Sequence, residues 1–288
     1  MIALLTGYNG FIGQNLKKVL IKRGYNILGI EKENVIEYLG EDINVFDNLV
    51  RECDVIFHVG AISDTANQDY HEMLLYNYQF TKILTDLANK HGKKVIYSSS
   101  ASVYGDGHNT SVPNNIYAWS KLLGEEYGRL SYPEGFTSLR YFNVYGPGEE
   151  HKGNMSSIGY QAYLHHHQNN MIYSFNLFPK KPTRDFVYVK DVVSANIAAS
   201  EAECGIYDVG SGSSRSFEDF LYNMSKIPYN YVSEDKIPEW YQFYTKANEE
   251  MWLPNWEPMF QLEDGCRDYL NYLKDGRKED TTTGRNLS

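Results

Sequence analysis

Two side chains with complementary chemistry, Tyr117 and Lys121, lie four residues apart in the sequence. If this segment is helical, both lie on one face, and the ammonium group can approach the phenol. A free tyrosine titrates near pH 10, so its use as a base near pH 7 requires about 4 kcal/mol of phenolate stabilisation. A fixed positive charge such as Lys121 can supply it. Because the chain has 25 tyrosines, the pair alone is weak evidence, and the rest of the sequence decides its meaning.

The N-terminus has the pattern of a dinucleotide site. Residues 2–6 are an apolar run of strand length, and an amphipathic segment at 14–23 follows a glycine-rich turn. Strand, turn and helix form a dinucleotide-binding fingerprint, here with the spacing GxxGxxG. Gly7 permits the tight turn, Gly10 lets the backbone approach a pyrophosphate, and Gly13 allows the helix to pack closely on the sheet.

The acid after the next apolar run bears on the choice of cofactor. Residues 25–30 read as a second strand, and Glu31 follows where a ribose-binding acid is expected. Its carboxylate accepts hydrogen bonds from a ribose diol and repels a 2′-phosphate, which favours NAD. Lys32 and Arg51 can offset that repulsion, so NADP stays open.

Strand-like and helix-like segments alternate through the first half of the chain. Apolar runs at 54–59, 93–97 and 136–140 alternate with helical patterns at 70–90 and 116–130. This rhythm predicts an α/β fold, a Rossmann-type doubly wound parallel sheet with helices on both faces.

The second half changes character after Gly146-Pro147-Gly148 and predicts a smaller mixed α/β substrate lobe at the C-terminal side. We expect residues 1–142, with about 184–210, to form the NAD(P)-binding domain. Residues 143–183 and 211–274 are then the substrate lobe. Residues 275–288 are polar and aperiodic, which predicts a disordered tail.

Composition excludes several classes of function. A formal net charge of −10 argues against a nucleic-acid surface, and it means that an anionic substrate needs a local basic cluster. No stretch approaches the roughly 20 apolar residues of a membrane span, and no signal-peptide layout opens the chain, so we expect a cytoplasmic protein without a membrane partner. Cys53, Cys204 and Cys266 lack metal-ligand spacing, so no metal site is expected.

Several segments together resemble the extended short-chain dehydrogenase/reductases, and among these the NAD-dependent epimerase/dehydratase family. They are the glycine turn, the Tyr117/Lys121 pair, Ser98-Ser99-Ser100-Ala101-Ser102-Val103-Tyr104-Gly105 and Arg140-Tyr141-Phe142-Asn143-Val144-Tyr145-Gly146-Pro147. The resemblance covers about residues 2–273. It implies that Ser100 hydrogen-bonds the reacting sugar oxygen, that Tyr117 is the acid/base, and that Lys121 binds the nicotinamide ribose and lowers the pKa of the tyrosine. An oxidised nicotinamide ring would be a second positive charge.

The resemblance also implies the remaining cofactor contacts. Phe11 and Ile12 in the turn, Asp42 at the adenine, and Gly60 and Ala61 after the third strand would complete the site. Members of the family commonly use NADP with an acid at the position of Glu31, which slightly favours NADP against the physical argument for NAD.

One stretch, Asn143 to Met155, is similar to the ADP-L-glycero-D-manno-heptose 6-epimerase family. That family carries a His-Lys-Gly-Ser-Met segment there, and its lysine is a proposed second base, a role that passes to Lys152. The resemblance further implies that Asn143, Asn154, Arg184 and Tyr241 contact a nucleotide-diphosphate sugar. Arginine can bind a phosphate bidentately.

The implied activity is that of a nucleotide-sugar epimerase. A sugar hydroxyl is transiently oxidised to a ketone with bound NAD(P) and re-reduced on its other face, so proton transfer must serve both orientations. Elimination is disfavoured, because Ala101-Ser102 stands where the related dehydratases carry an acid pair. The runner-up is a UDP-hexose 4-epimerase or another sugar-nucleotide oxidoreductase, and the alternative of another class is a non-catalytic dinucleotide-binding regulatory protein. Family members form oligomers, so we expect a homo-oligomer.

Overall fold

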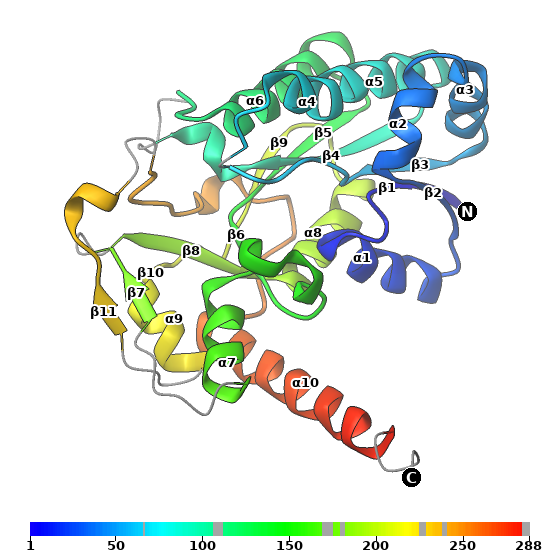
Figure 1. The fold of residues 1–288 in the computed structure, drawn as a ribbon. Helices are drawn as coiled ribbons and strands as arrows, with labels where there is room; N and C mark the ends of the chain where they lie inside the picture. The colour runs from blue at the N-terminus through cyan, green and yellow to red at the C-terminus, as the bar shows by residue number, and fades with distance from the viewer. Residues whose placement is uncertain are drawn as a thin grey trace.

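The computed structural model describes residues 1–65, 67–105, 112–168, 175–178, 182–224, 229–237 and 241–283. It confirms the predicted fold class, with a six-stranded parallel sheet between two layers of helices and a smaller mixed region beside it (Figure 1). None of the helices in these ranges is long and apolar enough to cross a membrane.

The large sheet reverses its strand order next to the N-terminal strand. The order is β2 (Asn26–Ile30), β1 (Ile2–Thr6), β3 (Val55–His58), β4 (Lys94–Ser100), β5 (Phe136–Tyr141) and β9 (Ile206–Val209), all parallel. Strands β3 and β5 are buried along their whole length, which explains their continuous apolar runs. In such sheets ligands bind beyond the carboxyl ends of the strands where the order reverses, here β1 and β3.

Helices cover both faces of this sheet. On one face lie α1 (Phe11–Lys22) and α8 (Val189–Glu201); on the other lie α2 (Lys32–Leu39), α3 (Ile43–Glu52), α4 (Tyr70–Leu74), α5 (Phe80–His91) and α6 (Ile116–Ser131) (Figure 1). Alternate residues of β1 serve the two cores: Ala3 and Leu5 pack with the first layer, and Leu4 packs with the second. The predicted helix over 70–90 contains a π-helical turn, η1 (Leu75–Gln79), between α4 and α5.

The smaller region contains two short sheets and three helices. One sheet has the order β10 (Ser214–Ser216), β8 (Thr183–Tyr188) and β6 (Asn143–Tyr145), and the other pairs β11 (Tyr229–Tyr231) with β7 (Phe175–Leu177). The helices are α7 (Ile158–Gln168), α9 (Phe217–Met224) and α10 (Leu262–Thr283). Short 3₁₀ turns are η2 (Ala101–Tyr104), η3 (Glu150–Met155), η4 (Glu234–Lys236) and η5 (Glu249–Met251). Tyr145, Tyr188, Phe220 and Tyr269 lie in its largely aromatic core.

Three boundaries differ from the sequence prediction. Strand β8 pairs with β6 and β10 and with no strand of the large sheet in the described ranges, although its Val187 packs in the core of that sheet together with residues of α8. Ala247, Leu253 and Trp256, predicted in the lobe, pack in the core of the large sheet. Finally, α10 continues to Thr283, into the segment 275–288 predicted to be a disordered tail, because residues such as Arg, Lys and Glu are good helix formers. Residues 284–288 lie outside the described ranges.

Candidate functional site

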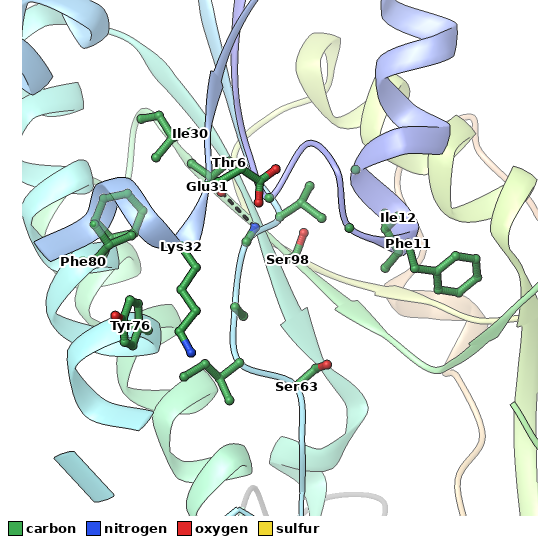
Figure 2. A pocket seen from close by; sticks show the side chains of 18 of the residues that line it. Thr6, Phe11, Ile12, Ile30, Glu31, Lys32, Ser63, Tyr76, Phe80 and Ser98 are labelled. Carbon is green, nitrogen blue, oxygen red and sulfur yellow. Dashed lines mark hydrogen bonds between the residues drawn. The ribbon is translucent and has the colours of Figure 1, made fainter. Parts of the chain in front are cut away.

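A cavity of about 330 Å³ opens at the carboxyl edge of the large sheet, where the strand order reverses (Figure 2). Most of the predicted cofactor and catalytic residues line it: Gly7, Gly10, Phe11, Ile12, Gly13, Glu31, Lys32, Gly60, Ala61, Tyr117, Lys121 and Lys152. The cavity therefore joins the end of β2 to helix α6 and to the segment after β6.

The glycine turn brings three backbone segments closer than side chains would allow. A Cβ atom on Gly13 would lie 2.0 Å from the carbonyl oxygen of Gly7. Gly7 has φ +64°, and a Cβ there would lie 2.6 Å from Cα of Gly60. Thr6 Oγ1 accepts a hydrogen bond from Gly60 N at 2.8 Å, which ties the turn after β3 to the end of β1. The glycine turn therefore presents backbone atoms without side chains to the cavity, and we call it the cradle.

The cradle fits the phosphates of a dinucleotide. Helix α1 begins after Gly10 and carries no acid in its first turn, so its N-terminal amides and dipole favour an anion. At the end of β2, Glu31 Oε1 accepts a hydrogen bond from Asn9 N at 2.7 Å, which fixes the carboxylate at the cavity edge. Lys32 Nζ lies 2.7 Å from Glu72 Oε1, so its charge is already paired.

Helix α6 carries Tyr117 and Lys121 on one face, as their spacing predicts. Asn115 caps the helix by accepting a hydrogen bond from Ala118 N at 2.8 Å. Burial raises the pKa of the Tyr117 phenol above its ordinary value, and the interaction with Ser100, at the end of β4, opposes this shift. Lys121 alone therefore does not acidify the phenol as the spacing predicts.

The physical reason lies in the burial of the lysine itself. Lys121 is 2% exposed, and burial lowers the pKa of its ammonium group to about 7, although Glu125 opposes the shift. Its Nζ atom lies 4.3 Å from the centroid of the Tyr97 ring. An ammonium group with a pKa near 7 is only partly charged at neutral pH and is a weaker source of positive potential than a solvated lysine.

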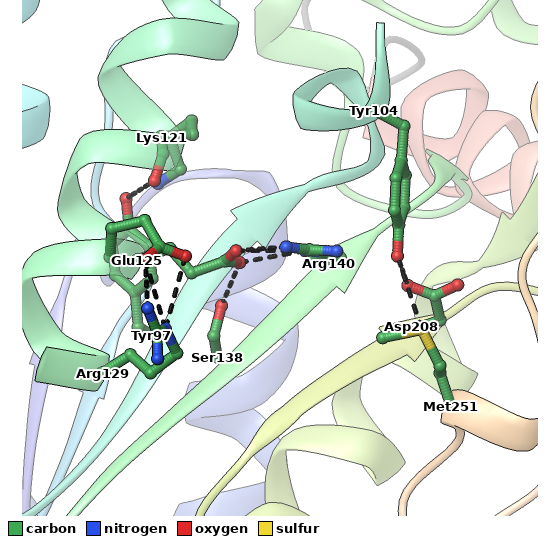
Figure 3. A network of polar contacts seen from close by, with 10 residues as sticks. Tyr97, Tyr104, Lys121, Glu125, Arg129, Ser138, Arg140, Asp208 and Met251 are labelled. Carbon is green, nitrogen blue, oxygen red and sulfur yellow. Dashed lines mark hydrogen bonds and ion pairs between the residues drawn. The ribbon is translucent and has the colours of Figure 1, made fainter. Parts of the chain in front are cut away.

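A buried charged network lies beneath Lys121 (Figure 3). Glu125, one turn further along α6, is fully buried and accepts hydrogen bonds from Arg140 Nε at 3.1 Å and from Ser138 Oγ at 2.7 Å. The Arg140 guanidinium lies 4.7 Å from the centroid of the Tyr104 ring. These contacts hold α6 in place against β5, and so they set the position of Tyr117 and Lys121 relative to the cavity.

Lys152 reaches the same cavity from η3. Its Nζ atom lies 5.6 Å from the centroid of the Phe11 ring, beside the glycine turn. Burial lowers the pKa of Lys152, and Glu149 opposes this effect. A lowered pKa increases the fraction of neutral amine, which is the form that can take a proton.

Six predicted site residues are not in the cavity lining: Ser100, which accepts a hydrogen bond from Ser102 N at 3.2 Å, and Asp42, Asn143, Asn154, Arg184 and Tyr241. Asp42 is exposed at the N-terminus of α3, and Asn143 and Asn154 are exposed in the segment after β5. Arg184 is buried, donates from Nη1 to Thr183 O at 3.0 Å and also donates to Gln242 O, and its guanidinium lies 5.1 Å from the centroid of the Tyr241 ring. Their predicted roles at adenine and substrate stay predictions.

Several lining residues escape prediction from sequence. They are the side chains that wall the cavity beyond the motifs, among them Ile62, Ser63, Tyr76, Phe80 and His151. Tyr76 belongs to the π-helical turn, which has no simple sequence signature. In the same turn, Asn77 accepts from Ile62 N at 2.7 Å and donates to Ser120 Oγ at 2.9 Å, so it joins the cavity wall to α6.

Comparisons with known proteins agree with this geometry. The curated ADP-L-glycero-D-manno-heptose-6-epimerase of Fusobacterium nucleatum is 32% identical, over 88% of this chain and 84% of the relative. The crystal structure of the Helicobacter pylori ADP-L-glycero-D-manno-heptose-6-epimerase matches with a TM-score of 0.80 at 28% identity, over 95% of this chain and 96% of that one.

A third similarity supports the fold alone. The UDP-glucuronic acid 4-epimerase of Bacillus cereus, solved in complex with UDP-glucuronic acid and NAD, matches with a TM-score of 0.77 at 22% identity, over 96% of this chain and 99% of that one. The sequence model of the NAD dependent epimerase/dehydratase family matches residues 3–210, most of the large sheet and its helices. The chain therefore belongs to the NAD dependent epimerase/dehydratase family.

Proposed function

We propose that this protein is a nucleotide-sugar epimerase, most similar in activity to the ADP-L-glycero-D-manno-heptose 6-epimerases. The observation that carries the proposal is the convergence of Tyr117, Lys121 and Lys152 on one cavity with the glycine turn. The identity of 32% with the Fusobacterium enzyme, and the His151-Lys152-Gly153 segment, support the choice of an ADP-heptose over other sugar nucleotides.

The residues at the end of β2 favour NAD as the cofactor. Glu31 offers a carboxylate to a ribose diol and opposes a 2′-phosphate. Lys32, one of the two cations that could offset this repulsion, is paired with Glu72. Titration of the dinucleotide-free protein should therefore give tighter binding of NAD than of NADP, and Glu31→Gln should tighten NADP binding about tenfold, because removal of a like charge is worth roughly one pKa unit of energy. Tighter binding of NADP by the unmodified protein would contradict this assignment.

The proposed chemistry divides proton transfer between two side chains. When bound, the dinucleotide supplies a reversible acceptor for the hydride of the sugar carbon. Tyr117 takes the hydroxyl proton of one orientation of the sugar, and Ser100, whose interaction with the phenol lowers the pKa of Tyr117 against the larger effect of burial, supports it. Lys152, which comes from a different segment and has a lowered pKa, serves the other orientation. No net oxidation results, so the protein should keep its cofactor between turnovers.

Product analysis separates the candidate functions. Purified protein with NAD is incubated with ADP-heptose of either C6 configuration and, separately, with UDP-galactose, and the products are identified by carbohydrate NMR. We expect both ADP-heptose epimers to reach the same mixture. Conversion of UDP-galactose alone would favour the UDP-hexose 4-epimerase, and bound dinucleotide without product from either sugar would favour the regulatory protein. Light scattering of the same sample checks the predicted homo-oligomer.

A further inference from the structure

The segment from Gly146 to Ser157, here called the lysine loop, carries Lys152 to the cavity. Hydrogen bonds within the loop and from α1 hold it. Most of η3 is exposed, so its own packing does little to fix the lysine. Gly153, directly after Lys152, has φ 53° and ψ −125°, which interrupts the 3₁₀ geometry. The position of Lys152 must therefore be set by contacts at other points of the loop.

A buried carboxylate draws the two ends of the lysine loop together. Glu149 is fully buried and accepts hydrogen bonds from Ser157 N at 2.5 Å, from Ser157 Oγ at 2.8 Å and from Gly146 N at 3.3 Å. Its backbone carbonyl accepts from Lys152 N at 3.0 Å. A buried acid is costly unless it is well hydrogen-bonded, so these bonds define one arrangement of the loop.

Two amides on the cofactor side dock the same loop on α1. Gln14 Nε2 donates to Gly148 O at 2.7 Å, and Asn15 Nδ2 donates to Pro147 O at 2.8 Å. Asn15 also donates to Phe11 O at 2.9 Å, and it is the Phe11 ring that faces the Lys152 ammonium. The helix that begins at the glycine turn thus holds the loop directly.

We propose that Glu149, Gln14 and Asn15 are positioning residues that hold Lys152 on the cofactor cavity. The lysine loop is closed on itself by Glu149 and docked on α1 by the two amides, so the helix that would bind the phosphates also sets the place of the second proton-transfer group. This inference rests on the proposed function for its catalytic consequence, while the placement of Lys152 can be tested without turnover.

The placement test uses chemical labelling of Lys152 in the dinucleotide-free protein. Acetylation by acetic anhydride, followed by peptide mass spectrometry, gives the rate at Lys152 relative to exposed lysines. We expect Glu149→Gln to raise this relative rate at least threefold and Gln14→Ala to raise it less. The matched control is Asp191→Asn, since Asp191 is also fully buried and accepts from two backbone amides, those of Met259 and Phe260, neither of which belongs to the lysine loop. Equal rates in Glu149→Gln, Gln14→Ala and the control would overturn the inference.

The catalytic test is a double-mutant cycle with ADP-heptose as the probe. We expect Glu149→Gln to lower kcat at least tenfold with little change in KM. In a Lys152→Met background, the same substitution should lower kcat less than twofold further, because it acts through that lysine. An equal loss in both backgrounds would show a general structural effect and end the positioning role. Full activity of Lys152→Met together with faster labelling in Glu149→Gln would refute the proposed role of Lys152 and leave its placement standing. If Glu149→Gln does not fold, Gln14→Ala takes its place in the cycle, because Gln14 is only partly buried and loses a single bond.

Discussion

The proposed cofactor side and the proposed sugar side of this molecule differ in how closely their predicted residues lie together. On the cofactor side, the glycine turn, Glu31 and the Tyr117/Lys121 pair surround one cavity. On the sugar side, Asn143 and Asn154 are exposed, and Arg184 is engaged by backbone carbonyls.

The difference follows from what each side must do. A cofactor that stays bound through repeated turnovers is served by rigid backbone, and the contacts at Gly7 and Gly13 are of that kind. A sugar ring that must present either face, as we propose, needs a site that forms around it from segments other than the fixed lysine loop, such as the stretch near Tyr241. The variants below test this contrast, beginning with the largest expected effect.

Tyr117→Phe should abolish most turnover while it leaves the cofactor side intact. Loss of the general acid/base is expected to reduce kcat by a factor of about 10²–10⁴, with the bound dinucleotide retained. Steady-state kinetics with ADP-heptose and absorbance of the purified protein measure the two quantities. Tyr127→Phe on the same helix is the control, because the Tyr127 hydroxyl donates to Asp86 at the surface and Tyr127 does not line the cavity, so its kcat should not change. Full turnover in Tyr117→Phe would remove this residue from the mechanism.

Lys121→Met should change how stability depends on pH. The folded pKa of Lys121 is about 7 and the unfolded value is near 10.5, so between these values the unfolded chain binds more protons and the free energy of unfolding rises with pH. The destabilisation caused by burying the charged Lys121 ammonium group is complete below pH 7 and disappears toward pH 10.5. Relative to Lys121→Met, the unmodified protein should therefore gain a few kcal/mol of stability across this range. Urea unfolding without dinucleotide at pH 6, 7.5 and 9 measures the difference, and parallel curves for the two proteins would contradict it.

Prediction from sequence succeeded where local backbone chemistry decides the structure. Short apolar runs located β1, β3 and β5 to within a residue or two, because strands covered on both faces need continuous apolar sequence. The glycine turn could also be predicted from sequence, because a Cβ atom on Gly13 would clash with the Gly7 carbonyl and only glycine fits there. These features depend on neighbours in sequence or on one close approach of backbone.

Prediction failed where partners distant in sequence decide the structure. Strand β8 was assigned to the cofactor domain, although it pairs with β6 and β10, because pairing partners leave no mark in the strand itself. The acidification of Tyr117 was expected from Lys121 together with a bound nicotinamide ring, but burial, which spacing cannot reveal, raises the pKa of Tyr117 and lowers that of Lys121, so the effect of the nicotinamide ring stays a prediction. The sequence likewise does not indicate that Glu149 lies between the two ends of the lysine loop.

Gly13→Ala should damage the cofactor side specifically. The added Cβ would lie 2.0 Å from a backbone oxygen, so α1 or the turn must shift, at a cost of about 1–3 kcal/mol in unfolding free energy and with weaker dinucleotide binding. The control is Gly92→Ala at the end of α5, where φ is +64° but nothing lies within 4 Å. It should cost about 1–2 kcal/mol through backbone strain alone and leave binding unchanged. Unchanged dinucleotide affinity in Gly13→Ala would show that the cradle is not the phosphate site.

Arg184→Lys should have the smallest effect and should act on the sugar side alone. The lysine keeps the charge but loses the planar fork that donates to Thr183 O and Gln242 O, so unfolding free energy should fall by about 1 kcal/mol. If Arg184 also contacts a substrate phosphate, KM for ADP-heptose should rise several-fold, while dinucleotide affinity is unchanged. Arg215→Lys, at the paired position on β10, is the control, because a lysine at this position can also form an ion pair with Glu263. A loss of stability with no change in KM would make Arg184 an anchor of the 241–245 segment, and the phosphate of the substrate would then have to be held elsewhere.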